Sequence, residues 1–265
     1  MPELKKRSLG TCREKAPVSW AIHQTGSFLI GEFFGGGYYR ECLRMAKAMA
    51  SQHRPALTAI HKPRVLSNLN LERLIEKLED VSRWAGEVEE EGFHTVNTHA
   101  FITLWAAQEA GVENIIAEII RTSEYAAKIA SEKFKKGKYS LADWPWSEST
   151  CLEIAQKLDP KAKNSTENGG VDIANRMVVL FSWFGLELQL SAMAANKYNE
   201  SSMVRNVILH RYGYLSSKDV ENFPELNEWV DEVLPITTER LTSYYNAVVA
   251  MHIAIAKSVW ESQYN

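Results

Sequence analysis

The stretch VDIANRMVVLFSWFGLELQLSAMAAN (residues 171–196) is apolar around almost its whole circumference when it is placed on a helix. At about 100° per residue, its one polar strip holds Asn175, Ser182 and Gln189, and Glu187 points the opposite way. A helix that is apolar on all sides is buried inside a larger protein. The sequence therefore predicts an all-α, single-domain, multi-helix bundle around one or two central buried helices.

Helical periodicity recurs along the rest of the chain. Residues 69–91 carry apolar side chains every three or four positions, which is typical of an amphipathic helix. Gly111 is interpreted as a stop between two helices, and Pro235 as a residue just before the last one. Further helices are predicted over residues 38–50, 98–110, 112–135, 149–158, 201–211, 219–233 and 236–261. Outside residues 27–30, no alternation typical of a strand is recognised.

The domain organisation is predicted to be simple. Residues 1–17 are charged and are expected to form a flexible N-terminal segment, and residues 18–265 a single helical domain. The stretch DPKAKNSTENGG (residues 159–170) is rich in turn residues and is the weakest internal boundary. No shift in composition accompanies it, which favours one domain over two.

Charge and cysteine content exclude several classes of protein. The net charge of −3 gives no electrostatic support for binding nucleic acid. The apolar runs are too short to span a bilayer, so no membrane partner is expected. Three widely spaced cysteines, Cys12, Cys42 and Cys151, form no disulfide framework and indicate a reducing, cytoplasmic setting. The expected partner is a small-molecule substrate, and a homodimer is left open.

Five ionisable residues stand in surroundings that point to a metal site. Glu187 is a carboxylate on an apolar face, where an unpaired charge is costly. His252 lies on the apolar side of the last helix, where a neutral imidazole can bind a metal. Glu91 and His94 have the ExxH spacing that places two ligands on one side of a helix. Glu32 is surrounded by phenylalanine, leucine and isoleucine. These five residues are the predicted metal ligands.

Each of these residues also has a structural interpretation. His252 can be a core residue with one hydrogen bond. Glu91 and His94 can form an acidic helix end and a loop if Gly92 stops the helix. Glu32 can lie in an exposed turn before the three glycines at residues 35–37, and Glu187 can pair with an arginine, for example Arg176 or Arg205.

The predicted function follows from the metal interpretation. Carboxylate and imidazole ligands suit iron or manganese, so we expect a non-haem oxidase or oxygenase acting on a small organic substrate in an apolar pocket. The ligand types and the helical setting resemble those of ferritin-like and haem-oxygenase-like di-iron oxidases, which implies that the metal could be di-iron. The second ExxH of such sites is missing, since Leu190 stands three residues after Glu187. The alternative is a non-catalytic helical binding or scaffold protein with a buried Glu187 ion pair.

Overall fold

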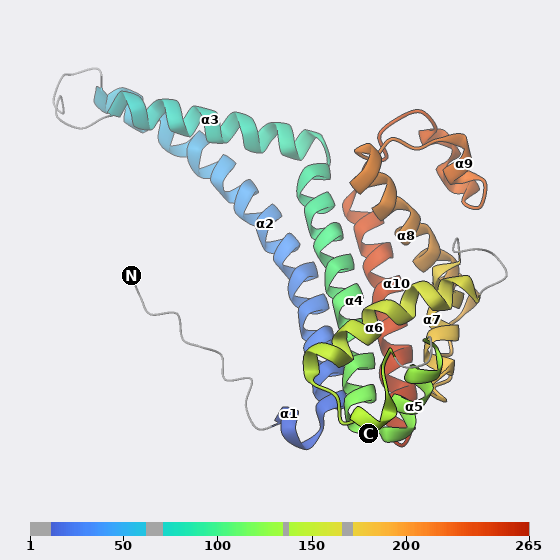
Figure 1. Cartoon of the computed structure of the whole chain (residues 1–265). Helices are drawn as coiled ribbons and strands as arrows, with labels where there is room; N and C mark the ends of the chain where they lie inside the picture. The colour runs from blue at the N-terminus through green and yellow to red at the C-terminus, as the bar shows by residue number, and fades with distance from the viewer. Residues whose placement is uncertain (1–11, 62–70, 135–137, 166–171, 265) are drawn as a thin grey trace.

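The computed structural model describes residues 12–61, 71–134, 138–165 and 172–264. Within these ranges the chain forms helices and no strand, and its β pairing is limited to two isolated bridges, Tyr214 with Val233 and Leu215 with Val230. The helices pack into a bundle (Figure 1), so the predicted all-α fold is confirmed. Among the described helices, none is long and apolar enough to cross a membrane.

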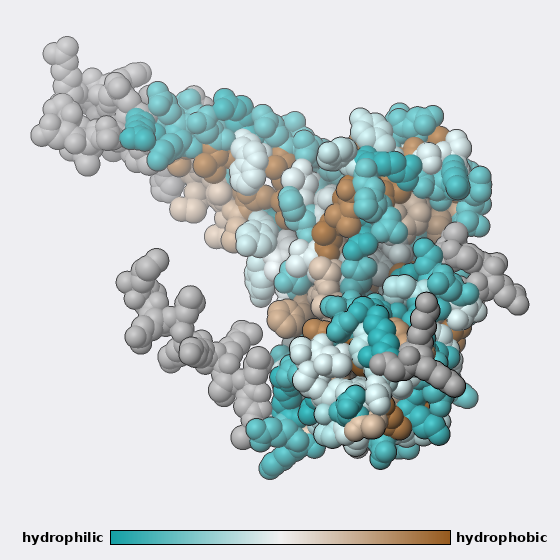
Figure 2. All heavy atoms as spheres, in the orientation of Figure 1, coloured by the Kyte–Doolittle hydropathy of each residue, from teal (hydrophilic) through white to brown (hydrophobic). Residues whose placement is uncertain are grey.

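Two long helices form an arm that projects from the bundle. After the short α1 (Cys12–Lys15), α2 (Pro17–His61) leaves the bundle, and α3 (Leu71–Glu90) returns antiparallel along it (Figure 1). An ion pair of 2.7 Å between Lys47 and Glu89 joins the two helices. Figure 2 shows mostly hydrophilic atoms over α3, whereas hydrophobic side chains gather along the edge of the arm that α2 forms.

The bundle is built around two central helices, α4 (His94–Thr122) and α10 (Thr238–Trp260). The remaining elements are α5 (Glu124–Glu132), η1 (Leu141–Asp143), α6 (Glu148–Asn164), α7 (Ile173–Ser182), α8 (Ala192–Arg211), α9 (Ser217–Val220) and η2 (Pro224–Trp229). Helix α4 contacts α2, α3, α5, α6, α8 and α10, while α10 contacts α2, α4 and α8. The predictions of helices over residues 69–91 and 236–261 are confirmed by α3 and α10.

The stretch at residues 171–196 is not one helix, and that prediction is wrong. Helix α7 ends at Ser182, Gly185 adopts a positive φ of 73°, and the chain then runs extended to the start of α8 at Ala192. In the extended part Leu186 and Leu188 are buried and Leu190 is half-buried, while Glu187, Gln189 and Ser191 are exposed. The sequence GLELQL alternates with a period of two, which is the pattern of an extended segment.

Glycines that were predicted to interrupt helices lie inside them. Helix α2 continues through residues 35–37, and a Cβ at Gly36 would lie 3.1 Å from the Cβ of Ala100 in α4. Helix α4 continues through Gly111, where a Cβ would lie only 2.2 Å from Cγ2 of Thr25 in α2. The close approach of α2 to α4 therefore requires a glycine at Gly111 and leaves little room for a side chain at Gly36, and the prediction of a helix end at Gly111 is wrong.

Three further boundaries differ from the predictions. Residues 219–233 form only the end of α9 and the 3₁₀ turn η2, and α6 continues past residue 158, with Pro160 inside it, to Asn164. Residues 166–171 of the predicted loop lie outside the described residues. Residues 12–17 belong to α1 and the start of α2, while residues 1–11 of the predicted flexible segment also lie outside the described part. The division into domains stays a prediction.

Candidate functional site

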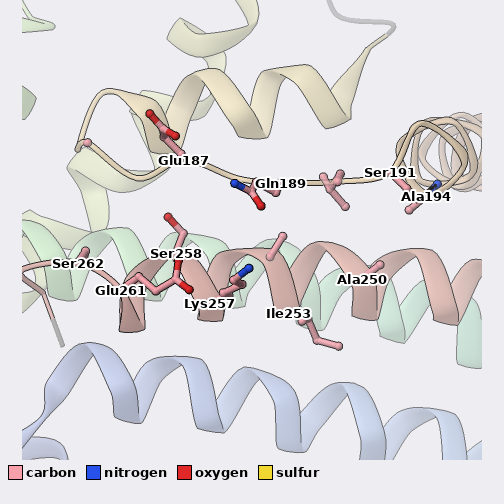
Figure 3. Close-up of a pocket in the computed structure, with 13 residues that line it drawn as sticks. Glu187, Gln189, Ser191, Ala194, Ala250, Ile253, Lys257, Ser258, Glu261 and Ser262 are labelled. Atoms are coloured by element: carbon pink, nitrogen blue, oxygen red, sulfur yellow. Dashed lines mark hydrogen bonds between the residues drawn. The ribbon is translucent and has the colours of Figure 1, made fainter.

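Glu187 lies on the surface and not in the core. It is exposed in the extended segment between α7 and α8, which lines a hollow of about 510 Å³ beside α10. Lys257, Ser258 and Glu261 line the α10 side of this hollow (Figure 3). The expectation of a buried Glu187 is wrong because Gly185 ends the helix and turns the alternate side chains of the segment outward.

The buried Glu187 ion pair is not present either. Arg176, one of the two arginines considered for it, lies 3.0 Å from Asp159, and the other, Arg205, lies 2.7 Å from Glu109. Arg176 therefore forms its ion pair with a carboxylate of α6, and Arg205 forms its ion pair with a carboxylate of α4. Burial raises the pKa of Asp159 and of Glu109, and the arginines act in the opposite direction.

Glu91 and His94 do not share a continuous helix. The chain turns through Gly92 (φ 65°) and Phe93 (φ 62°), so the helix stops as one of the two interpretations predicts. Glu91 is exposed, whereas His94 is half-buried, and its Nδ1 accepts a hydrogen bond of 2.9 Å from the backbone N–H of Ile236. The imidazole thus joins the start of α4 to the segment before α10.

His252 is a core residue between two helices. It is buried in α10, is hydrogen-bonded to the backbone of Ile22 in α2, and its Nε2 would lie 3.0 Å from a Cβ at Gly26. Burial lowers the pKa of His252 and favours the neutral ring. These surroundings agree with the interpretation of His252 as a core residue with one hydrogen bond.

The five predicted metal ligands are spread over the molecule. Glu32 lies in α2, Glu91 and His94 at the α3–α4 turn, Glu187 before α8 and His252 in α10. Among the residues that the structure describes, no group of three or more histidine, cysteine, aspartate or glutamate side chains is placed to hold a metal ion. Iron or manganese binding by these residues stays a prediction.

A second candidate site is a long groove between α2 and α4. Two hollows of about 440 and 350 Å³ adjoin along it and share Glu32 and Thr103; we call them together the α2–α4 groove. Its lining reaches from Trp20 to Tyr39 along α2, which at 1.5 Å per residue is about 28 Å. This length corresponds to about five turns of a helix.

Small residues make up half of the groove lining. On α4 they recur every three or four positions, which places them on one side of that helix. These α4 residues are Ala100, Thr103, Ala106, Ala107, Ala110 and Gly111. On α2 the small residues Gly35 and Gly36 lie at one end with the exposed ring of Tyr39, and the exposed ring of Phe28 lies about two turns away.

Of the charged residues that line the groove, Arg13 forms ion pairs within the described chain, whereas Glu32 does not. At one end Arg13 pairs with Glu118 at 2.8 Å and with Glu148 at 2.6 Å. Hydrogen bonds to the carboxylates of Glu148 and Glu118 raise the pKa of Arg13 and keep it charged. Glu32, midway along the groove, makes no ion pair or hydrogen bond to another described residue and is half-buried. The groove thus offers one carboxylate without a partner among the described residues, in a lining that also holds the polar side chains of Gln24, His99 and Asn114.

Comparison of the chain with models of protein families, with curated proteins and with solved structures found no match. The function is therefore inferred from the geometry of the groove and the arm.

Sequence reasoning found Glu32 but missed the rest of the groove. The apolar segment around Phe28 was interpreted as ending in a turn at the glycines, so its exposed rings were not placed beside α4. The signal that could have found the groove is the spacing of Ala100, Thr103, Ala107 and Ala110, because small residues at helical spacing mark a helix face that another helix can approach closely.

His94 gives the protein a predicted dependence on pH. Burial lowers the pKa of His94 below its ordinary 6.5, and its Nδ1 must be unprotonated to accept the Ile236 N–H. Below pH 6.5 the imidazole of His94 is protonated more readily in the unfolded chain than in the folded chain. The free energy of unfolding is therefore largest above pH 6.5 and falls as the pH is lowered. We expect His94→Asn, which retains an acceptor near Nδ1, to flatten this fall in urea titrations from pH 7 to 5. The exposed His210→Asn is the control, and an unchanged slope in His94→Asn would contradict the assignment.

Proposed function

We propose that this protein is a non-catalytic, cytoplasmic helical binding or scaffold protein whose α2–α4 groove binds an amphipathic helix of a partner protein. The observation that supports this proposal is the groove itself, about 28 Å long and walled in large part by small residues and exposed rings. Amphipathic helices bind in apolar grooves through side chains at positions i, i+3, i+4 and i+7. An iron- or manganese-dependent oxidase is the alternative proposal, and metal analysis of the purified protein tests it.

The small residues decide which kind of occupant the groove suits. Glycine and alanine residues on both walls allow the backbone of a third helix to approach α2 and α4 closely. Gly35 has no atom of the described chain within 4 Å of a Cβ built on it, so this end of the groove is open. The exposed rings of Phe28 and Tyr39 would then pack against the sides of the bound helix.

Glu32 decides the chemistry of the partner. A half-buried carboxylate without a partner in the described chain is stabilised by a cation brought by the ligand. We therefore expect the bound helix to carry a lysine or arginine on its apolar side, near the middle of its length. Such a pair would fix the register of the helix in the groove.

Selection of helical peptides tests this proposal. A displayed library of amphipathic peptides about five turns long is selected on the immobilised protein, and selected peptides are titrated by fluorescence anisotropy. We expect a common apolar stripe with one central basic residue. Affinity should fall at least about tenfold in Glu32→Lys, because the charge pair becomes a repulsion, and binding should be lost in Gly35→Trp, which fills the groove.

Two matched variants control for these changes. Glu187→Lys makes the same change of charge at an exposed carboxylate in the other hollow, and Gly31→Trp adds the same ring to α2 at a position that also has no neighbour within 4 Å. Both should bind the selected peptides as the wild type does. Peptides that bind all four variants equally, or a library that yields no binder, would overturn the proposal.

A further inference from the structure

Large apolar side chains are exposed along the outside of α2. Between Ile30 and Met49 five of them have the following exposed fractions: Ile30 50%, Phe34 56%, Tyr38 72%, Met45 62% and Met49 54%. At 100° per residue they fall within about 100° of arc, on the side of α2 opposite the residues that contact α3 and α4. We call these five side chains the outer stripe; it is about 28 Å long.

The outer stripe leaves α2 apolar on two opposite sides. Its inner side packs in the core through Ala21, Ile22 and Leu29 and along the arm through Ala50. A helix with apolar residues on both sides is normally covered on both. At roughly 100 Å² of exposed surface for each side chain, the stripe exposes about 500 Å², near the upper range for a monomeric protein. Figure 2 shows hydrophobic atoms along this edge of the arm.

We infer that a second copy of this chain packs on the outer stripe, with the two α2 helices antiparallel. This interface lies on another side of α2 from the α2–α4 groove and does not depend on the proposed peptide binding. Two stripes brought together would bury about 1,000 Å², which reaches the size expected of a specific interface. A two-fold axis requires a surface that is complementary to itself.

The order of residues along the stripe meets this requirement. When the axis crosses α2 between Tyr39 and Arg40, Phe34 of one copy faces Met45 of the other, and sulfur–aromatic contacts of this kind are favourable. In the same register Met49 of one copy faces Ile30 of the other, so a flexible side chain again meets a stiffer one. Four of the five stripe residues thus pair with one another, while Tyr38 faces Glu41, and each contact occurs twice.

Charge favours a second copy over other occupants. Glu41 lies within the arc of the stripe and pairs with Arg44 at 2.6 Å, so its charge is already neutralised and does not call for a charged partner. A lipid surface would require lysine and arginine around the apolar face. The neighbouring α3 is instead acidic in its described residues, with exposed Glu76, Asp80, Glu87 and Glu90.

The mass of the full chain in solution tests this inference. We expect light scattering after size exclusion to give the mass of two chains for the wild type at micromolar concentration. Phe34→Glu and Met45→Glu should each give one chain, because they place a carboxylate in the centre of the interface. Met193→Glu is the matched control: Met193 is 81% exposed on α8, far from α2 in the fold, and the dimer should persist. Circular dichroism verifies that each variant is folded.

A crosslink provides a second readout. In the proposed pair the two exposed Cys42 side chains lie about 8 Å apart along the helix axis, so a short bis-maleimide should join two chains in a Cys12→Ser background, where the remaining Cys151 is buried. A wild type that is monomeric throughout, a dimer that survives both stripe variants, or a dimer that Met193→Glu also dissociates would overturn the inference. Selected peptides can still bind a monomer, so a result that rules out the dimer leaves the proposed peptide binding in the α2–α4 groove to be tested separately.

Discussion

Replacing Gly111 by alanine is expected to destabilise the protein by about 3 kcal/mol. The added Cβ would lie 2.2 Å from Cγ2 and 2.5 Å from Oγ1 of Thr25, distances that packed atoms do not adopt. Helices α2 and α4 would have to separate at the point where they approach most closely, and α4 packs against most of the bundle. Urea denaturation followed by circular dichroism measures the change in the free energy of unfolding.

Two further variants distinguish this clash from an effect of glycine on the helix. Gly35→Ala changes the same residue type inside α2, where no atom lies within 4 Å of the new Cβ, and should stabilise by about 0.5–1 kcal/mol. Combining Gly111→Ala with Thr25→Ala removes the two nearest atoms and should recover about half of the loss. If Gly111→Ala is as stable as the wild type, the close packing of α2 on α4 is refuted.

Replacing Tyr244 by phenylalanine is expected to cost about 2 kcal/mol. The Tyr244 hydroxyl donates a hydrogen bond of 2.8 Å to Oε1 of Glu200, and both residues are fully buried. Lys197 holds the other carboxylate oxygen. Burial raises the pKa of Glu200, and the bonds from Lys197 and Tyr244 act against that rise. Without the hydroxyl, one oxygen of a buried carboxylate loses its donor, while the ring that contacts Phe101 is retained.

The adjacent Tyr245 supplies the control for this variant. Its ring stacks on Phe33 at 3.9 Å, and its hydroxyl makes no hydrogen bond among the described residues. Tyr245→Phe should therefore change the free energy of unfolding by less than about 0.5 kcal/mol. Equal stability losses in the two variants, measured by urea denaturation at pH 7, would show that the bond to Glu200 contributes nothing specific.

The candidate site could be predicted only in part. Glu32 was recognised because a carboxylate among phenylalanines is unusual, and the structure places it in the α2–α4 groove. Glu187 was recognised for the same reason, yet it is exposed. A helical wheel assumes that the helix continues through Gly185, whereas the chain leaves the helix there, so the wheel gives the wrong orientation for every later residue. A single positive φ therefore decided whether that carboxylate is in the core.

The sequence by itself determined that this protein is helical and determined where helices such as α3 and α10 lie, because the periodicity of apolar residues is a local property that each segment carries. Only the tertiary structure decided what the interrupting residues do. Gly111 and Gly36 could equally have ended helices, and it is the approach of α2 to α4 that makes them interior positions. The exposure of Phe34 and Met45 was likewise beyond the sequence, since whether an apolar side chain is buried depends on which neighbours cover it.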